Sequence, residues 1–152
     1  TSRFANRGVA AETAVQKFLV EWAERTPGRE FNRLPDSKAA GRIIKAAPAD
    51  FDFYCNTHED TSAFGLIEAK ETEHEYRLAR DKVSQLPRLR KRANCGGLCV
   101  VLVLHSTLKK WRCVGAGYLH TTGDKGSWNL SNVPTFDSAR EALAHHAPEV
   151  FG

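Results

Sequence analysis

The sequence predicts a single α/β domain in which a mixed central β-sheet is flanked by helices. Three observations predict this class: a helical pattern over residues 9–24, two extended segments around a polar loop, and a continuous apolar run over residues 98–104. A continuous apolar run is typical of a strand buried on both faces, and such a strand needs helices on either side of it. The chain has 152 residues, which is enough for one sizeable core.

The first helix is predicted over residues 9–24. Its apolar residues recur at spacings of three and four along the sequence: Ala11, Val15, Phe18, Leu19 and Trp22. Glu12 borders this apolar stripe, so its carboxylate either serves the helix dipole or reaches a site beneath the helix. A short strand over residues 30–34 and a basic loop over residues 35–47 are predicted to follow.

Residues 50–55 and 63–69 are predicted to form an antiparallel hairpin around a polar loop. A turn centred on residue 59 would place Asp50 directly opposite Glu68, with Cβ atoms about 5 Å apart. Lys70 would share the face of Glu68, because side chains alternate along a strand. Two such carboxylates repel unless a cation lies between them, and Mg²⁺ accepts carboxylate, water and phosphate oxygens. Asp52 would point to the same face as Asp50, and it is the alternative ligand.

A second helix is predicted from Gln85 to about Ala93, with Ser84 as its N-cap. Pro87 would then lie in the first turn, where its missing N–H is harmless. The leucines of this helix would face inward and its arginines outward. Gln85 would lie at the helix start, where its side chain can reach the active edge of the sheet.

The remaining elements follow the apolar run. Residues 111–114 are predicted as a strand, residues 116–135 as a loop, and residues 138–146 as a short closing helix. His145 and His146 are interpreted as part of a tail rather than as metal ligands. No Cys-x-x-Cys pair, secretory signal or membrane-spanning apolar run occurs in the sequence, which favours a reducing, cytoplasmic compartment.

Basic residues gather in three groups, and the net charge is +4. The groups are Lys38, Arg42 and Lys45; Arg77, Arg80, Lys82, Arg88, Arg90, Lys91 and Arg92; and Lys109, Lys110 and Arg112. A solvated helix face would explain any one group, but three groups around a candidate metal site favour a phosphate-binding surface. The candidates for DNA contact are Arg7, Arg33, Lys38, Arg42, Lys45, Arg88, Arg90, Lys91 and Arg92.

Several of these segments resemble the PD-(D/E)xK nuclease superfamily, and within it the Holliday junction resolvases of the RecU-like and archaeal types. The resemblance is carried by Pro48-Ala49-Asp50, by Glu68-Ala69-Lys70-Glu71-Thr72 and by the preceding helix with Glu12. Asn6-Arg7-Gly8 and Gln85 are similar to further positions of these resolvases. The match covers roughly residues 5–115, so a single nuclease domain over residues 1–152 would have its core there and a C-terminal extension over 116–152.

The resemblance implies a restriction-endonuclease-like fold and an Mg²⁺-dependent endodeoxyribonuclease, in which Mn²⁺ can substitute. The implied catalytic residues are Glu12, Asp50, Glu68, Lys70 and Gln85, with Asp50, Glu68 and Glu12 as metal ligands. A bacterial or phage homodimer would then resolve four-way junctions by paired nicks during DNA recombination and repair. The alternatives are another nuclease of this fold, acting in branched-DNA repair or restriction, and a non-catalytic basic DNA-binding protein.

Overall fold

The computed structural model describes residues 9–35, 47–57, 61–119 and 126–152. The predictions for Arg7, Lys38, Arg42 and Lys45 therefore lie outside the described residues. The elements, in chain order, are α2 (Val9–Arg25), β1 (Arg29–Arg33), β2 (Phe51–Asn56), β3 (Ser62–Thr72), β4 (Arg77–Ala79), η1 (Arg80–Lys82), α3 (Leu86–Asn94), β5 (Leu98–His105), β6 (Lys110–Gly115), η2 (Ala116–Tyr118), β7 (Ser127–Asn129), α4 (Ala139–His146) and α5 (Pro148–Phe151).

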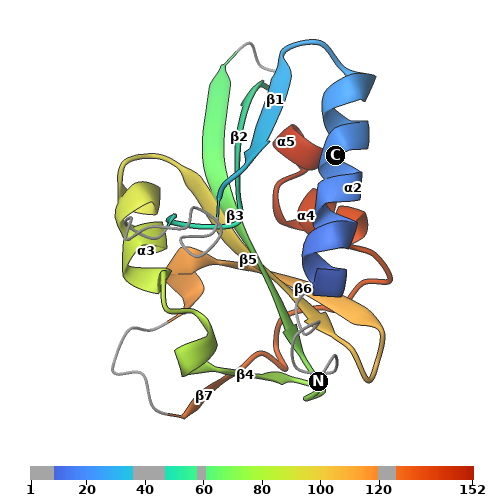
Figure 1. Ribbon diagram of the computed structural model, residues 1–152, viewed down its shortest axis with the longest axis vertical. Helices are drawn as coiled ribbons and strands as arrows, with labels where there is room; N and C mark the ends of the chain where they lie inside the picture. The colour runs from blue at the N-terminus through green and yellow to red at the C-terminus, as the bar shows by residue number, and fades with distance from the viewer. Residues whose placement is uncertain (1–8, 36–46, 58–60, 120–125) are drawn as a thin grey trace.

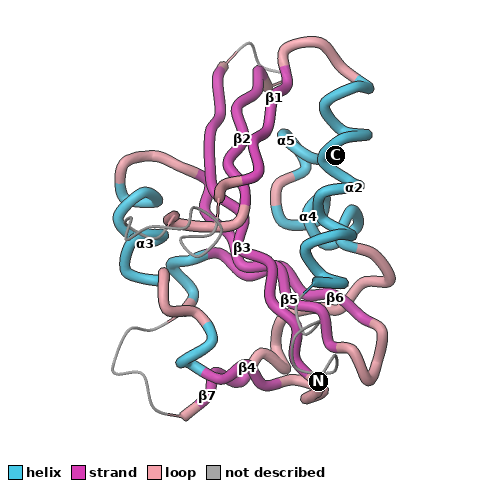
Figure 2. The backbone as a smooth tube through the Cα atoms, in the orientation of Figure 1, coloured by secondary structure: helices cyan, strands magenta, loops and turns pink. Residues whose placement is uncertain are grey.

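A five-stranded mixed sheet in the order β1-β2-β3-β5-β6 forms the centre of the molecule (Figure 1). β3 and β5 are parallel, and the other neighbouring strands are antiparallel. Helices α2, α4 and α5 pack on one face of the sheet, and α3 packs on the other (Figure 2). This arrangement confirms the predicted α/β class with helices on both faces of a mixed sheet.

The hairpin of β2 and β3 has the predicted register. Phe51 lies opposite Ile67 and Asp52 lies opposite Leu66, so the same register brings Asp50 to the level of Glu68. Asp50 itself directly precedes β2, while β3 continues to Thr72 alongside β5. The level of Glu68 is therefore the point at which β3 loses its β2 neighbour and retains only β5.

Helix α3 differs from its prediction at the first residue. Its N-cap is Gln85 rather than Ser84, and no side chain caps it. Pro87 lies in the first turn as predicted, and both leucines of the helix are buried. The helix ends at Asn94, and Gly96, two residues later, adopts a φ of +97°, a left-handed conformation that glycine enters without strain.

A second, two-stranded sheet pairs β4 with β7. Residues 116–135 were predicted as a loop, and this prediction is wrong for β7. Trp128 of β7 is only 6% exposed and joins the α3-side core, so tertiary packing determines the extended conformation of a short polar segment. Among the described residues, no helix has the length and apolar character needed to span a membrane.

The C-terminal helices belong to the core on the α2 side. The Phe151 ring lies 5.1 Å from the Phe53 ring and 5.5 Å from the Trp22 ring, measured between centroids. The indole N–H of Trp22 donates to the Val150 carbonyl at 2.9 Å. α4 and α5 thus contribute buried side chains to the same hydrophobic core as α2 and β2. The division into a nuclease core over residues 5–115 and a C-terminal extension stays a prediction.

Candidate active site

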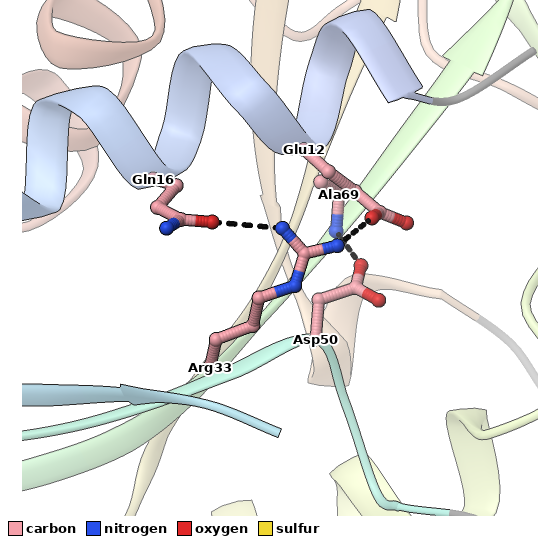
Figure 3. Close-up of polar contacts among 5 residues, drawn as sticks. All are labelled: Glu12, Gln16, Arg33, Asp50 and Ala69. Atoms are coloured by element: carbon pink, nitrogen blue, oxygen red, sulfur yellow. Dashed lines mark hydrogen bonds and ion pairs between the residues drawn. The ribbon is translucent and has the colours of Figure 1, made fainter. Parts of the chain in front are cut away.

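Asp50 is held by main-chain contacts on both sides. The Ala69 N–H donates to Asp50 Oδ2 at 2.8 Å, which ties the carboxylate to β3 (Figure 3). The Leu34 N–H donates to the Asp50 carbonyl at 2.8 Å, which ties its backbone to the residue after β1. The Asp50 carboxylate is therefore positioned by the sheet itself.

Glu68 is a buried acid, with only 4% of its surface exposed. Burial, followed by the hydrogen bond and charge of Asp50, raises the pKa of the Glu68 carboxyl to about 9. The charge of Lys70 acts in the opposite direction and lowers this pKa. The raised pKa favours the form of the pair in which Glu68 carries a proton at neutral pH. A cation bound between the two groups would displace that proton.

Lys70 lies on the same side of β3 as Glu68. Val101 and Val103, which lie opposite these two residues in β5, belong to the same α3-side core. Lys70 is half-buried, and its charge is close enough to act on the pKa of the Glu68 carboxyl. The Glu-x-Lys segment thus presents an acid and a cation to one side, as strand alternation predicts.

Glu12 reaches this region from α2, but it is paired with a residue that sequence analysis assigned elsewhere. Arg33 Nη2 donates to Glu12 Oε2 at 2.8 Å, and Arg33 Nη1 donates to Gln16 Oε1 at 2.7 Å (Figure 3). The charge of Glu12 is the last of the causes that raise the pKa of Glu68, so its carboxylate lies near enough to act on that group. Sequence reasoning missed Gln16, although its position one helical turn after Glu12 was a signal.

Asp52, the alternative ligand, has a different partner. Its Oδ1 accepts a hydrogen bond from Asn32 Nδ2 at 3.0 Å, whereas Asp50 is the acid joined to Glu68. Within the described ranges, no three His, Cys, Asp or Glu side chains form a group that could hold a metal ion. The structure thus brings two candidate ligands together as a pair and places the third, Glu12, in a salt bridge with Arg33.

Comparisons with known proteins identify the fold. No model of a protein family matches the chain, and no curated protein is similar to it in sequence. Among solved structures, the chain is similar to Hjc of Archaeoglobus fulgidus, a Holliday junction resolvase, with a TM-score of 0.50. The two share 18% identity, and the match covers 86% of this chain and 95% of Hjc. The fold is restriction-endonuclease-like. The predicted fold class is confirmed, and the resemblance to RecU-like proteins stays a prediction.

Within this restriction-endonuclease-like fold, Gln85 lies at the start of α3 as predicted, and its side chain is half-buried. In the described part of the chain, its hydrogen bonds are those of its carbonyl, which accepts from Arg88 N–H and Leu89 N–H at 3.0 Å. A catalytic role for Gln85 stays a prediction.

The basic residues of α3 divide into two kinds. Lys91 and Arg92 are exposed, as a phosphate-binding surface requires, and Arg88 is half-buried. Arg90 is half-buried, and its Nη1 donates to the carbonyls of Ala116 and Leu119. Arg90 thus anchors the η2 turn, which corrects the prediction that it points outward.

Arg112 also departs from its predicted place in a basic surface group. It is only 6% exposed, and its guanidinium donates to the carbonyls of Glu75 and Val133 and to His105 Nε2. Its charge is enclosed by carbonyl oxygens and an imidazole, so Arg112 is a structural residue that ties β6 to the segment before β4.

Proposed function

We propose that this protein is a metal-dependent endonuclease that acts on branched DNA and resolves four-way junctions by paired nicks. The observation that carries the proposal is the Asp50–Glu68 pair, with Lys70 on the same side of β3. A buried carboxyl group paired with a half-buried one, beside a lysine, suits phosphodiester hydrolysis with a divalent cation. The likeness of the fold to a Holliday junction resolvase supports branched DNA as the substrate.

The residues suit a hard cation such as Mg²⁺, because the candidate ligands are all carboxylate oxygens. Asp50 and Glu68 would hold the ion, and Glu12 would join them on exchanging its contact with Arg33. When bound, Mg²⁺ would polarise the phosphate and lower the pKa of a water molecule. Lys70 would orient the attacking water or neutralise the charge that develops on the phosphate.

DNA would be held through its backbone by the exposed cations of α3, Lys91 and Arg92, together with Arg88. Symmetrical nicks in two strands require two active sites, so the proposed form is a homodimer. Contacts of this kind position the DNA without reading its sequence.

The test compares a synthetic four-way junction with a linear duplex of the same sequence, each in the presence of Mg²⁺. Paired nicks near the crossover support the proposal. Lys70→Ala should reduce cleavage by about 10²–10³-fold or more while junction binding is retained, because the lysine acts on developing charge. Lys17→Ala, which removes an exposed lysine of α2, is the matched control and should cleave normally.

Other outcomes decide between the alternatives. Cleavage of the linear duplex at fixed sequences would indicate a restriction-type nuclease of the same fold. Tight junction binding without cleavage in either Mg²⁺ or Mn²⁺ would indicate a DNA-binding protein and would overturn the enzymatic proposal. Normal cleavage by Lys70→Ala would show that the active site has been assigned wrongly.

A further inference from the structure

A hollow of about 230 Å³ opens on the α3 side of the β2–β3 hairpin. In Figure 1 the hairpin extends past α3, so α3 does not cover the whole of this face. The residues that line the hollow and bear on its function are Leu34, Asp52, Tyr54, Phe64, Leu66 and Arg92. Arg92 is one of the cations proposed to hold the DNA backbone, but the other five residues have no role in the proposed function.

Two aromatic rings form a wall of the hollow. Tyr54 and Phe64 lie directly opposite each other across β2 and β3, and they are 51% and 40% exposed. Directly opposed residues share a face of the sheet, so both rings border the same space. A Cβ atom added to Gly97 would lie 3.0 Å from Phe64 Cε2, which shows that the Phe64 ring rests against the turn after α3. Exposed and supported rings of this kind are platforms for stacking.

The charges around the hollow are balanced. Its described lining carries one acid, Asp52, and one base, Arg92, and is otherwise uncharged. A phosphate group would need an excess of cations, whereas a flat neutral ring suits an aromatic wall with a single carboxylate. Asp52 can accept hydrogen bonds from the amino groups of a nucleobase, and Arg92 can reach the adjoining backbone.

The hollow lies next to the candidate active site. Asp52 is opposite Leu66, and Glu68 follows Leu66 by two residues on the same face of β3. Two residues of a strand span about 7 Å. A nucleotide adjoining the cleaved phosphate could therefore place its base in the hollow.

We propose that this hollow binds one unpaired nucleobase of the DNA, next to the phosphate at the Asp50–Glu68 pair. The proposal rests on the proposed function and concerns how that function selects its substrate. Bases at a branch point are the easiest to unstack, because the continuous helix is interrupted there. A pocket that needs an unstacked base favours branched over linear DNA without reading a particular sequence.

The test combines a change in the protein with a change in the DNA. Binding is measured with Ca²⁺ in place of Mg²⁺, on four-way junctions that carry either a normal nucleotide or an abasic one at successive crossover positions. Tyr54→Ala should weaken binding of the normal junction by about tenfold. An abasic nucleotide at one crossover position should weaken wild-type binding by a similar factor. Tyr54→Ala and that abasic junction together should weaken binding no more than either change alone.

One control variant and one further test variant accompany this cycle. Tyr118→Ala removes a tyrosine of similar exposure (47%) outside the hollow, and its affinity should equal that of wild type. Phe64→Leu tests the other ring and should follow Tyr54→Ala. A 2-aminopurine base at the responsive position should change in fluorescence on wild-type binding and change less with Tyr54→Ala.

Three results would overturn the proposal. The first is an unchanged affinity of Tyr54→Ala for the normal junction, and the second is an equal loss on normal and abasic junctions at every position. The third is a change of oligomeric state in Tyr54→Ala, measured by sedimentation, which would assign the hollow to contact between two copies of the chain. Failure of the proposed function is distinct, because wild-type protein would then neither bind nor cut junctions in preference to duplex.

Discussion

Glu68 links the candidate active site to the stability of the fold. Its carboxyl has a pKa of about 9 in the folded chain, against a usual value of 4.5. At a pH between these two pKa values, the folded protein holds a proton that the unfolded chain has released. The resulting stability is fully present below about pH 4.5 and is lost as the pH rises through about 9.

We predict that Glu68→Gln removes this loss. In buffer free of divalent cations, urea unfolding should show that the free energy of unfolding of wild type falls between pH 5 and pH 9 relative to that of Glu68→Gln. The difference should exceed about 1.4 kcal/mol, the equivalent of one pKa unit. Glu21→Gln, which changes an exposed glutamate of α2, should follow wild type. Parallel pH profiles for wild type and Glu68→Gln would contradict a raised Glu68 pKa.

Arg33 forms a salt bridge with the Glu12 carboxylate, which is a ligand of the proposed metal site. We predict that Arg33→Gln binds Mg²⁺ about two- to fivefold more tightly, since an exposed pair contributes up to about 1 kcal/mol. Isothermal titration calorimetry in the absence of DNA measures this directly. Arg25→Gln, which changes an exposed arginine at the end of α2, is the control. An unchanged Mg²⁺ affinity in Arg33→Gln would mean that Arg33 does not compete for Glu12.

At the scale of elements, the register of the β2–β3 hairpin was predictable because it depends only on residues that are close together in the sequence. The polar loop between two alternating segments defines a turn centre, and that centre alone sets which residues face each other. The β4–β7 pair was not predictable, because three-residue strands carry no periodicity. Trp128 is extended through its burial beside α3, and that contact depends on segments far apart in the chain.

The conformation of the segment between β3 and β4 depends on the buried imidazole of His105. Arg112 can only donate, so His105 Nε2 accepts from Arg112 Nη1 at 2.9 Å, and His105 Nδ1–H donates to the His74 carbonyl at 2.6 Å. The imidazole is therefore neutral. Burial is the largest cause that lowers the pKa of His105 from its usual 6.5. The stability that the neutral His105 imidazole contributes to the fold is present above about pH 6.5. It is lost as the pH falls through the lowered pKa.

We predict that acid opens the β4–β7 pair before the five-stranded sheet. Amide hydrogen exchange should show β4 and β7 losing protection first as the pH falls below the usual histidine pKa of 6.5. His105→Leu should remove this pH dependence and should destabilise the fold by about 1–3 kcal/mol at pH 7, because Arg112 loses an acceptor. Simultaneous loss of protection in both sheets would contradict the prediction.

At the scale of the whole molecule, α2 and α5 meet in one core although they are far apart in the sequence. Phe151 is 1% exposed and contacts rings from α2 and β2. The sequence indicated the closing helix, but periodicity does not state which surface a helix covers. The Arg33–Glu12 contact was missed for the same reason, since it depends on where α2 lies on the sheet.

We predict that Phe151→Ala costs about 3–5 kcal/mol of folding free energy, a value typical of a buried phenylalanine. Urea unfolding at pH 7 measures the loss. Glu149→Ala changes an exposed neighbour in the same helix and should alter stability by less than about 0.5 kcal/mol. A small effect of Phe151→Ala would mean that the C-terminal helices are peripheral to the core.

The bond that holds the Asp50 carboxylate comes from the main-chain amide of residue 69. Every amino acid except proline supplies such a donor. Replacements at that position therefore retain the donor wherever the new side chain fits the core. The position of the Asp50 carboxylate therefore depends on the path of the backbone of β3 more than on the identity of the side chain at residue 69.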